Sequence, residues 1–164
     1  MNIQKIRYKN AFSVVFDVEP VVYTYCSVKL VLQPLLENAI SYGVSGMDEL
    51  GEIRVVARKQ GERIILSVED NGLGMSEEEA ELVLTDSDRI HKRGSGVGLI
   101  NVNNRIQMLF GKEYGLVVES EPDEGTTVSI CIPAVPYTDE NRRILEKGFM
   151  FGADEINNRE IQDK

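Results

Sequence analysis

Three short segments decide the fold of this chain: Gln33-Pro34-Leu35-Leu36-Glu37-Asn38-Ala39-Ile40, Glu69-Asp70-Asn71-Gly72-Leu73-Gly74-Met75 and Gly94-Ser95-Gly96-Val97-Gly98-Leu99. The first places two polar residues on an apolar helical repeat. The second is a glycine-containing turn after a predicted strand, and the third is a glycine-rich loop before a predicted helix. Each pattern is common alone, so their order within one small chain carries the information.

Alternating apolar and polar residues predict strands at 12–19, 52–59, 63–69, 114–120 and 126–132. Pro20 and Pro133 end the first and the last of them, because proline cannot donate to a sheet ladder. A turn at Gln60-Gly61-Glu62 joins the second and third strands into a hairpin, which delivers Asp70 at its exit.

Helices are predicted between these strands. Apolar residues recur at helical spacing from a cap at Ser27 to Gly43, with Pro34 near the first turn. Further helices are expected at 77–81, 98–110 and 139–147, and a loop at 85–96. Strands on one face and helices on the other describe a two-layer α+β sandwich.

The length, composition and charge of the chain indicate its domain organisation and limit its possible partners. The chain has 164 residues, of which 42% are hydrophobic, and this predicts one domain over 1–133 with a C-terminal tail over 134–164. We expect the tail to carry a short helix, to dock partly through Phe149 and Phe151, and to end in a disordered segment. The net charge of -9 argues against nucleic acid and anionic lipid as partners.

The cysteine count and the apolar runs indicate a cytoplasmic, soluble chain. Cys26 and Cys131 lie far apart in apolar surroundings without metal-type spacing, which is typical of buried reduced thiols. No apolar run approaches the roughly 20 residues that a membrane-spanning helix needs.

Together the three segments resemble the N, G1 and G2 boxes of the GHKL ATP-binding superfamily. The runs Gln33–Ile40 and Gly96–Ile106, with Glu124-Gly125-Thr126-Thr127, are most similar to sensor histidine kinases of the LytS/YesM-like subfamily. The resemblance covers residues 3 to 133. It implies the Bergerat fold, a two-layer α/β sandwich with a mixed, mostly antiparallel sheet and helices on one face.

The resemblance also implies an ATP site with Mg2+ as cofactor. Asp70 would accept the adenine amino group, with Thr126 assisting through water, and Asn38 would bind the Mg2+ on the phosphates. Glu37 would polarise the attacking group or orient the metal's waters. The other nucleotide-binding residues implied are Tyr42, Gly72, Gly74, Met75, Arg93, Gly94, Ser95, Gly96, Val97, Gly98 and Leu99.

The glycine-rich loop is expected to cradle phosphates, because main-chain amides at a helix N-terminus favour negative charge. It is neither a P-loop nor a Rossmann fingerprint, since its glycine spacing differs and no Lys-Ser/Thr pair follows. One departure from the family weakens the site: Ser41 stands where many relatives carry a lysine that reaches a phosphate. The lid before Gly94 is expected to be short.

By resemblance the chain is the catalytic domain of a two-component sensor histidine kinase. It would transfer the γ-phosphoryl group of ATP to a histidine on a dimerisation hairpin that this chain lacks, for passage to a response regulator. The one histidine, His91, falls in the expected lid and is interpreted as a surface residue. The parent would be a dimeric membrane receptor with this domain in the cytoplasm, and the fragment itself is expected to be monomeric.

The sequence is also compatible with two alternatives. One is a free-standing GHKL serine kinase of the anti-sigma-factor kind, which needs no hairpin. The other is a degenerate nucleotide-sensing scaffold that keeps the fold and has lost the transfer, as Ser41 suggests.

Overall fold

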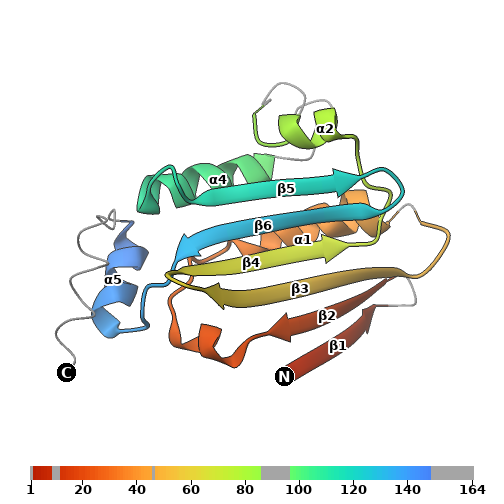
Figure 1. Ribbon diagram of the computed structural model, residues 1–164. Helices are drawn as coiled ribbons and strands as arrows, with labels where there is room; N and C mark the ends of the chain where they lie inside the picture. The colour runs from red at the N-terminus through yellow and green to blue at the C-terminus, as the bar shows by residue number, and fades with distance from the viewer. Residues whose placement is uncertain (1, 9–11, 46, 86–96, 149–164) are drawn as a thin grey trace.

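The computed structural model describes residues 2–8, 12–45, 47–85 and 97–148 (Figure 1). The strands are β1 (Asn2–Tyr8), β2 (Phe12–Val18), β3 (Gly51–Gln60), β4 (Arg63–Asp70), β5 (Gly115–Glu121) and β6 (Gly125–Pro133). The helices are the 3-10 helix η1 (Pro20–Thr24), α1 (Leu32–Asn38), the π-helix η2 (Ala39–Val44), α2 (Glu77–Leu82), α4 (Val97–Phe110) and α5 (Asp139–Lys147). Within these ranges no helix has the length and apolarity required to cross a bilayer.

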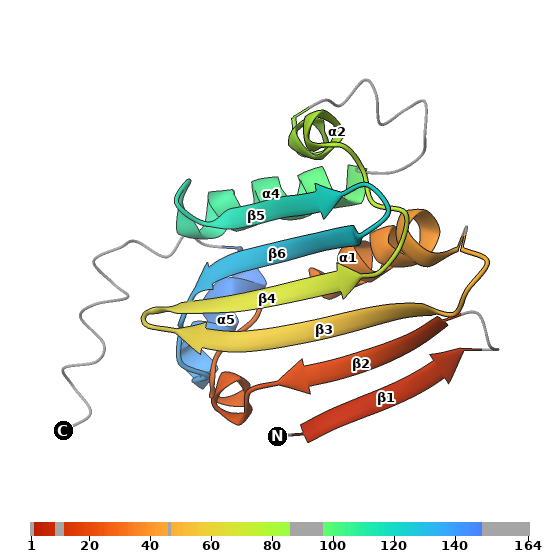
Figure 2. The same cartoon turned by 45° about the vertical axis from the view of Figure 1, so that its right-hand side comes forward.

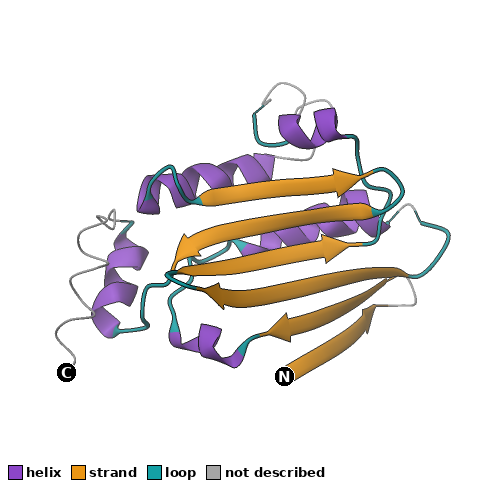
Figure 3. Ribbon diagram, in the orientation of Figure 1, coloured by secondary structure: helices purple, strands orange, loops and turns teal. Residues whose placement is uncertain are grey.

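The described strands form one mixed sheet in the order β1-β2-β3-β4-β6-β5. β2 and β3 are parallel, because the chain crosses between them through α1 and η2, and all other neighbouring pairs are antiparallel. Helices α1 and α4 cover the same face of this sheet, as Figures 2 and 3 show from two directions. The predicted two-layer α+β sandwich, with a mixed and mostly antiparallel sheet, is confirmed.

The core lies between the sheet and these two helices. On β3 the side chains of Ile53, Val55 and Ala57 are buried, and those of the residues between them are more exposed. Leu35 of α1 and Ile106 of α4 are completely buried against this face. Each such side chain contributes about 1.5–3 kcal/mol through burial, so the core fixes both helices over the sheet.

Most predicted elements occur where the sequence places them. The hairpin turns at Gly61 and Glu62, and α4 runs from Val97 to Phe110. Helix α2 begins after Ser76, whose hydroxyl accepts from the Glu79 amide while the Glu79 carboxylate accepts from the Ser76 amide. This reciprocal cap explains why a run of acidic residues starts a helix.

The predicted start of the first long helix is wrong. The helix does not follow a cap at Ser27 but begins at Leu32, with Val31 as its N-cap. Leu30 has a φ of 62°, which is incompatible with a right-handed helix. Val28 is buried from a non-helical segment, so its apolar character reflects burial and not helix periodicity.

Two elements were not predicted from the sequence, and two predicted segments lie outside the described residues. β1 and the 3-10 helix η1 have no counterpart among the predicted elements, whereas η2 is the π-helical end of the helix that was predicted to reach Gly43. Residues 86–96 of the predicted loop, and the segment from Phe149 onward, lie outside the described residues.

Residues 134–148 fold back onto one end of the sandwich, where Figure 1 shows α5 beside the sheet. Val135 and Leu145 join the core, and the Cys26 amide donates to the Val135 carbonyl at 2.7 Å. Helix α5 is capped at its start by Thr138, whose hydroxyl accepts from the Asn141 amide, and at its end by Gly148, which adopts the left-handed conformation. This segment therefore packs against the domain.

Candidate functional site

Three polar residues form a row across three neighbouring strands at one end of the sheet. Asp70, the last residue of β4, pairs in register with Thr126 of β6, and Thr126 pairs with Ser120 of β5. Val68 and Val128, two positions along the strands, face the core, so alternation places the row on the helix-covered face. Asp70 is 9% exposed and Thr126 is 5% exposed. Asp70 and Thr126 thus form a buried polar patch on an otherwise apolar surface, and the half-buried Ser120 extends it.

Asp70 is held by main-chain groups. The Gly72 amide donates to Asp70 Oδ1 at 2.9 Å. Burial raises the pKa of the Asp70 carboxyl, and main-chain hydrogen bonds from Gly72 and Thr126 oppose that rise. No side-chain cation among the described residues takes part in this shift of the pKa. The carboxylate is therefore an acceptor that lacks a charged partner inside the described fold.

The last turn of η2 closes over Asp70. An added Cβ at Gly43 would lie 2.5 Å from the Asp70 carboxyl, and one at Gly72 would collide with the Gly43 carbonyl. The Leu73 amide donates to that carbonyl at 3.3 Å. Only glycine at both positions allows this approach, which brings the end of the first helix against the Asp70 turn.

The turn after Asp70 is fixed at several points. The Asn71 side chain accepts from the Glu52 amide at 2.7 Å, and the Leu73 carbonyl accepts from the Asp123 amide at 2.7 Å. Gly74 has a φ of 62° and lies so close to the Glu121 carbonyl that a side chain would overlap it. The Met75 amide donates to Ser120 Oγ at 2.9 Å. The loop is thus a rigid edge beside Asp70.

The polar residues of the first helix lie on its outer side. Leu35 and Ala39 are buried against the sheet, whereas Glu37 is exposed and Asn38 is half-buried. Gln33 Nε2 donates to Glu37 Oε1 at 2.8 Å. Tyr42 is 41% exposed on η2. Asn38 and Gly43 belong to one continuous helical segment, which links the outer polar residues to the Asp70 turn.

The start of α4 lies beside this same segment. An added Cβ at Gly98 would be 3.1 Å from Pro34 Cβ, so the first turn of α4 packs on the first turn of α1. Val97 is 46% exposed and Leu99 is 1% exposed within the core. The side chain of Leu99 therefore packs in the core and anchors α4, so Leu99 could contact a ligand only through its main chain. Arg93, Gly94, Ser95 and Gly96 lie outside the described residues.

Two residues of this arrangement were missed from the sequence. Gly43 was interpreted only as a helix stop, although it allows the contact with Asp70. Ser120 sits in an ordinary alternating strand, so no local signal marks it, and only the register of the β5–β6 hairpin brings it to Thr126.

Comparison with known proteins identifies the family of this chain. Residues 27–136 match the model of the family described as "Histidine kinase-, DNA gyrase B-, and HSP90-like ATPase". The chain is 36% identical over 133 residues to the sensor histidine kinase YesM of Bacillus subtilis (strain 168), and 34% identical over 138 residues to the sensor protein LytS of Bacillus anthracis. The matches cover 81% of this chain and 22% of either relative, so the chain spans about a fifth of their length.

The fold has a solved counterpart. The catalytic domain of the histidine kinase ThkA superimposes with a TM-score of 0.58 at 18% identity, covering 83% of this chain and 98% of that one. Such a likeness supports the fold alone. The family match extends over the first helix, the Asp70 turn, α4 and β6. The chain belongs to the family of histidine kinase-, DNA gyrase B- and HSP90-like ATPases.

Proposed function

We propose that this chain is the Mg-ATP-binding catalytic domain of a two-component sensor histidine kinase. The observation that carries the proposal is Asp70, a buried carboxylate without a cation among the described residues, cradled by Gly43 and Gly72. A carboxylate in that position suits a ligand that offers N–H donors, as the amino group of adenine does. Gly74 and Met75 would form the edge of the adenine pocket.

The phosphates would lie toward α1 and α4. Main-chain amides at the start of α4 favour negative charge, and the proposed contacts there come from Arg93 and residues 94–99. The exposed side of α1 fits a magnesium ion, because Asn38 offers one amide oxygen and Mg2+ keeps most of its waters. When bound, Mg2+ would neutralise phosphate charge. Glu37, held by Gln33, would orient the attacking group, and Tyr42 would flank the nucleotide.

The acceptor would be a histidine on a separate helical hairpin, and the phosphoryl group would then pass to a response regulator. We further propose that the parent is a dimeric membrane receptor, with this domain on the cytoplasmic side, and that the chain alone is monomeric. The ATPase domain would end near residue 133, with 134–148 as a packed extension.

Incubation with γ-labelled ATP and Mg2+ tests the transfer. The chain alone should remain unlabelled, and a separately expressed histidine-bearing hairpin from the parent kinase should become labelled on its histidine. Glu37→Gln should slow that labelling by about 100-fold or more, the loss expected for a positioned acid–base group. Lys29→Gln is a matched control, because its ion pair with Glu146 lies away from the site. Label on this chain, or an unlabelled hairpin despite bound ATP, would contradict the proposal.

A further inference from the structure

Ser120 sits at the end of the polar row and contacts three groups at once. Its Oγ lies 2.9 Å from the Met75 amide nitrogen, 2.9 Å from the Gly125 carbonyl oxygen and 2.8 Å from Thr126 Oγ1. It comes from β5, whereas the proposed adenine contacts come from β4, β6 and the turn after β4. Ser120 thus joins the adenine edge to the strand that carries Thr126.

The direction of each hydrogen bond follows from counting hydrogens and lone pairs. A serine hydroxyl has one hydrogen and two acceptor lone pairs. The Met75 amide can only donate and the Gly125 carbonyl can only accept, so Ser120 accepts from the first and donates to the second. One lone pair remains for Thr126. Thr126 must therefore donate its own hydroxyl hydrogen to Ser120.

This direction fixes what Thr126 can offer to a ligand. With its hydrogen committed to Ser120, the buried Thr126 hydroxyl presents lone pairs alone. Asp70, its partner in register, also presents acceptors when ionised. The two groups together suit donors, either from a ring amino group or from a water that donates both to Thr126 and to an acceptor nitrogen of the ring.

We propose that Ser120 is a positioning residue that holds the Thr126 hydroxyl as an acceptor, and thereby makes the site select a 6-aminopurine over a 6-oxopurine. The inference rests on the proposed ATP site and extends it to base selectivity. A 6-oxopurine carries an acceptor in place of the amino group and a donor at the neighbouring ring nitrogen. The fixed acceptors of the row repel the oxygen at position 6, because it replaces the N–H donor that they need.

The test is calorimetric titration of Mg-ATP and Mg-ITP into the full chain and its variants, because these nucleotides differ only at that edge of the base. Ser120→Ala frees the Thr126 hydroxyl to rotate and should lower the preference for ATP over ITP by about fivefold, the factor that corresponds to one net hydrogen bond. Ser120→Thr keeps a hydroxyl on a strand and should restore the preference.

The matched control is Ser129→Ala. It breaks a hydroxyl pair of the same 2.8 Å length, between Ser67 and Ser129, on the opposite face of the same sheet. Its preference for ATP should equal that of the parent chain. If Ser120→Ala does not fold, Ser120→Cys provides the same test, since a thiol is a weak donor of similar size.

A double-mutant cycle shows whether Ser120 acts through Thr126. Thr126→Val should lower the preference by itself, and adding Ser120→Ala to it should cause no further change. An unchanged preference in Ser120→Ala, or an equal loss in the Thr126→Val background, would overturn the inference. Failure of the parent chain to bind either nucleotide would instead overturn the proposed function.

Discussion

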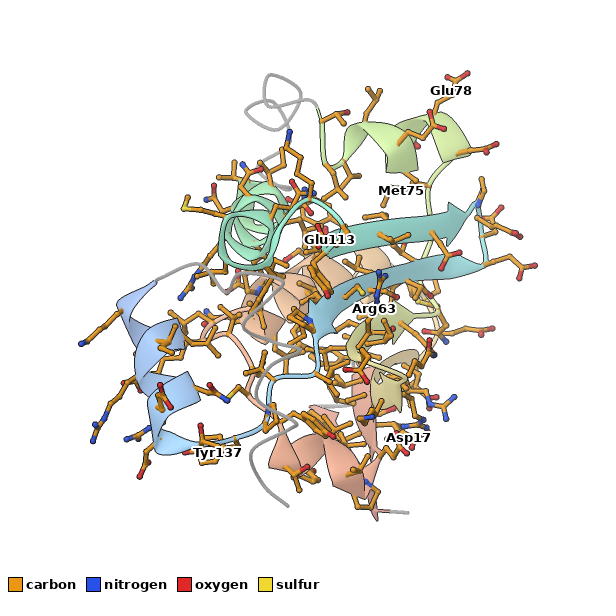
Figure 4. The ribbon with its side chains drawn as sticks, turned by 60° about the vertical axis from the view of Figure 1, so that its left-hand side comes forward. Asp17, Arg63, Met75, Glu78, Glu113 and Tyr137 are labelled. Atoms are coloured by element: carbon orange, nitrogen blue, oxygen red, sulfur yellow. The ribbon has the colours of Figure 1, made fainter. Side chains whose placement is uncertain are left out.

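Asp17 on β2 and Asp70 on β4 are both buried aspartates of one sheet, yet their surroundings are opposite. Asp17 Oδ2 accepts from Arg54 Nη2 and Arg58 Nη2, both at 2.7 Å. Hydrogen bonding to Arg58 is the main cause of a lowered pKa at Asp17. Asp70 has main-chain donors instead, and burial raises its pKa. Figure 4 shows Asp17 near the β1 edge and Met75, which follows Asp70 in sequence, near the β5 edge.

This difference is the one expected between a structural carboxylate and a carboxylate that binds a ligand, the role that we propose for Asp70. Asp17 is neutralised within the fold, although its buried Oδ1 has no hydrogen-bond partner among the described residues. Asp70 is buried at a cost in free energy that no side-chain cation among the described residues offsets. A binding partner with N–H donors would offset this cost. Loss of stability at a site in exchange for affinity is common in functional sites.

Asp70→Asn should have the largest effect. The amide keeps an acceptor for Gly72 but loses the charge, so we expect Mg-ATP affinity to fall by about 30- to 100-fold, equivalent to about 2–3 kcal/mol for a charged hydrogen bond. The thermal midpoint should stay unchanged or rise, because a raised pKa means that the ionised form destabilises the fold at neutral pH. Calorimetric titration and thermal melting measure both.

Glu69→Gln is the matched control for Asp70→Asn. It removes a neighbouring charge whose side chain lies, by strand alternation, on the other face of the sheet. It should leave nucleotide affinity unchanged. Equal losses in both variants would mean that net charge and not the Asp70 contact governs binding.

Gly43→Ala should weaken binding less. The new Cβ would lie 2.5 Å from the Asp70 carboxyl and displace it, which typically costs about 1–3 kcal/mol. We expect roughly tenfold weaker Mg-ATP binding and a lower free energy of unfolding in urea titration. Ser41→Ala, an exposed change on the same helical turn, serves as the control. Full affinity in Gly43→Ala would show that Asp70 is not the contact.

Asp17→Asn should reverse the pattern of Asp70→Asn. It removes the negative charge that both arginines pair with, so we expect a lower free energy of unfolding and unchanged affinity for Mg-ATP. Since the folded pKa of Asp17 is lowered from 3.8, its contribution to stability is present above that value and is lost as the pH falls through the folded pKa. Acid unfolding followed by circular dichroism should be less steep in the variant.

The pKa values of Asp70 and Asp17 shift in opposite directions, and this predicts which of the two carboxylates is protonated first as the pH falls. Asp70 protonates at a higher pH than Asp17, because burial raises the first pKa and arginines lower the second. Nucleotide affinity should therefore decline while the circular dichroism spectrum still reports a folded chain. Simultaneous loss of both signals would contradict the assignment of the two carboxylates.

Ser41→Lys should have the smallest effect. Ser41 is exposed on η2, three residues after Asn38, and an added ammonium there would gain a partly screened attraction to phosphate. We expect Mg-ATP affinity to rise by about two- to fivefold at low salt and the gain to shrink at high salt. Unchanged affinity at low salt would place the phosphates away from η2.

The sequence was sufficient where the signals are local. The hairpin at Gly61 and the helices predicted at 77–81 and 98–110 rest on residues within a few positions of each other. β1 was missed because an edge strand depends on pairing with β2 and its own alternation is weak. The start of α1 was misjudged because Val28 is buried without being helical.

Some residues of the site could be identified from the sequence and others could not. The resemblance singled out Asp70 and Thr126, and their register across β4 and β6 brings them together. Gly43 shapes the site through its contact with Asp70, 27 residues later in the chain. Ser120 does so through its hydrogen bond to Thr126 on the neighbouring strand. Such contacts are set by packing and strand register, which no local pattern reports.

Backbone NMR during titration with Mg-ATP would locate the bound nucleotide on the sheet. If ATP binds at the Asp70 end, the largest amide shifts should occur in residues 70–75 and at Gly125 and Thr126, with little change around Asp17. Shifts centred on Arg54 and Arg58, where two guanidinium groups offer an alternative partner for phosphates, would contradict this location.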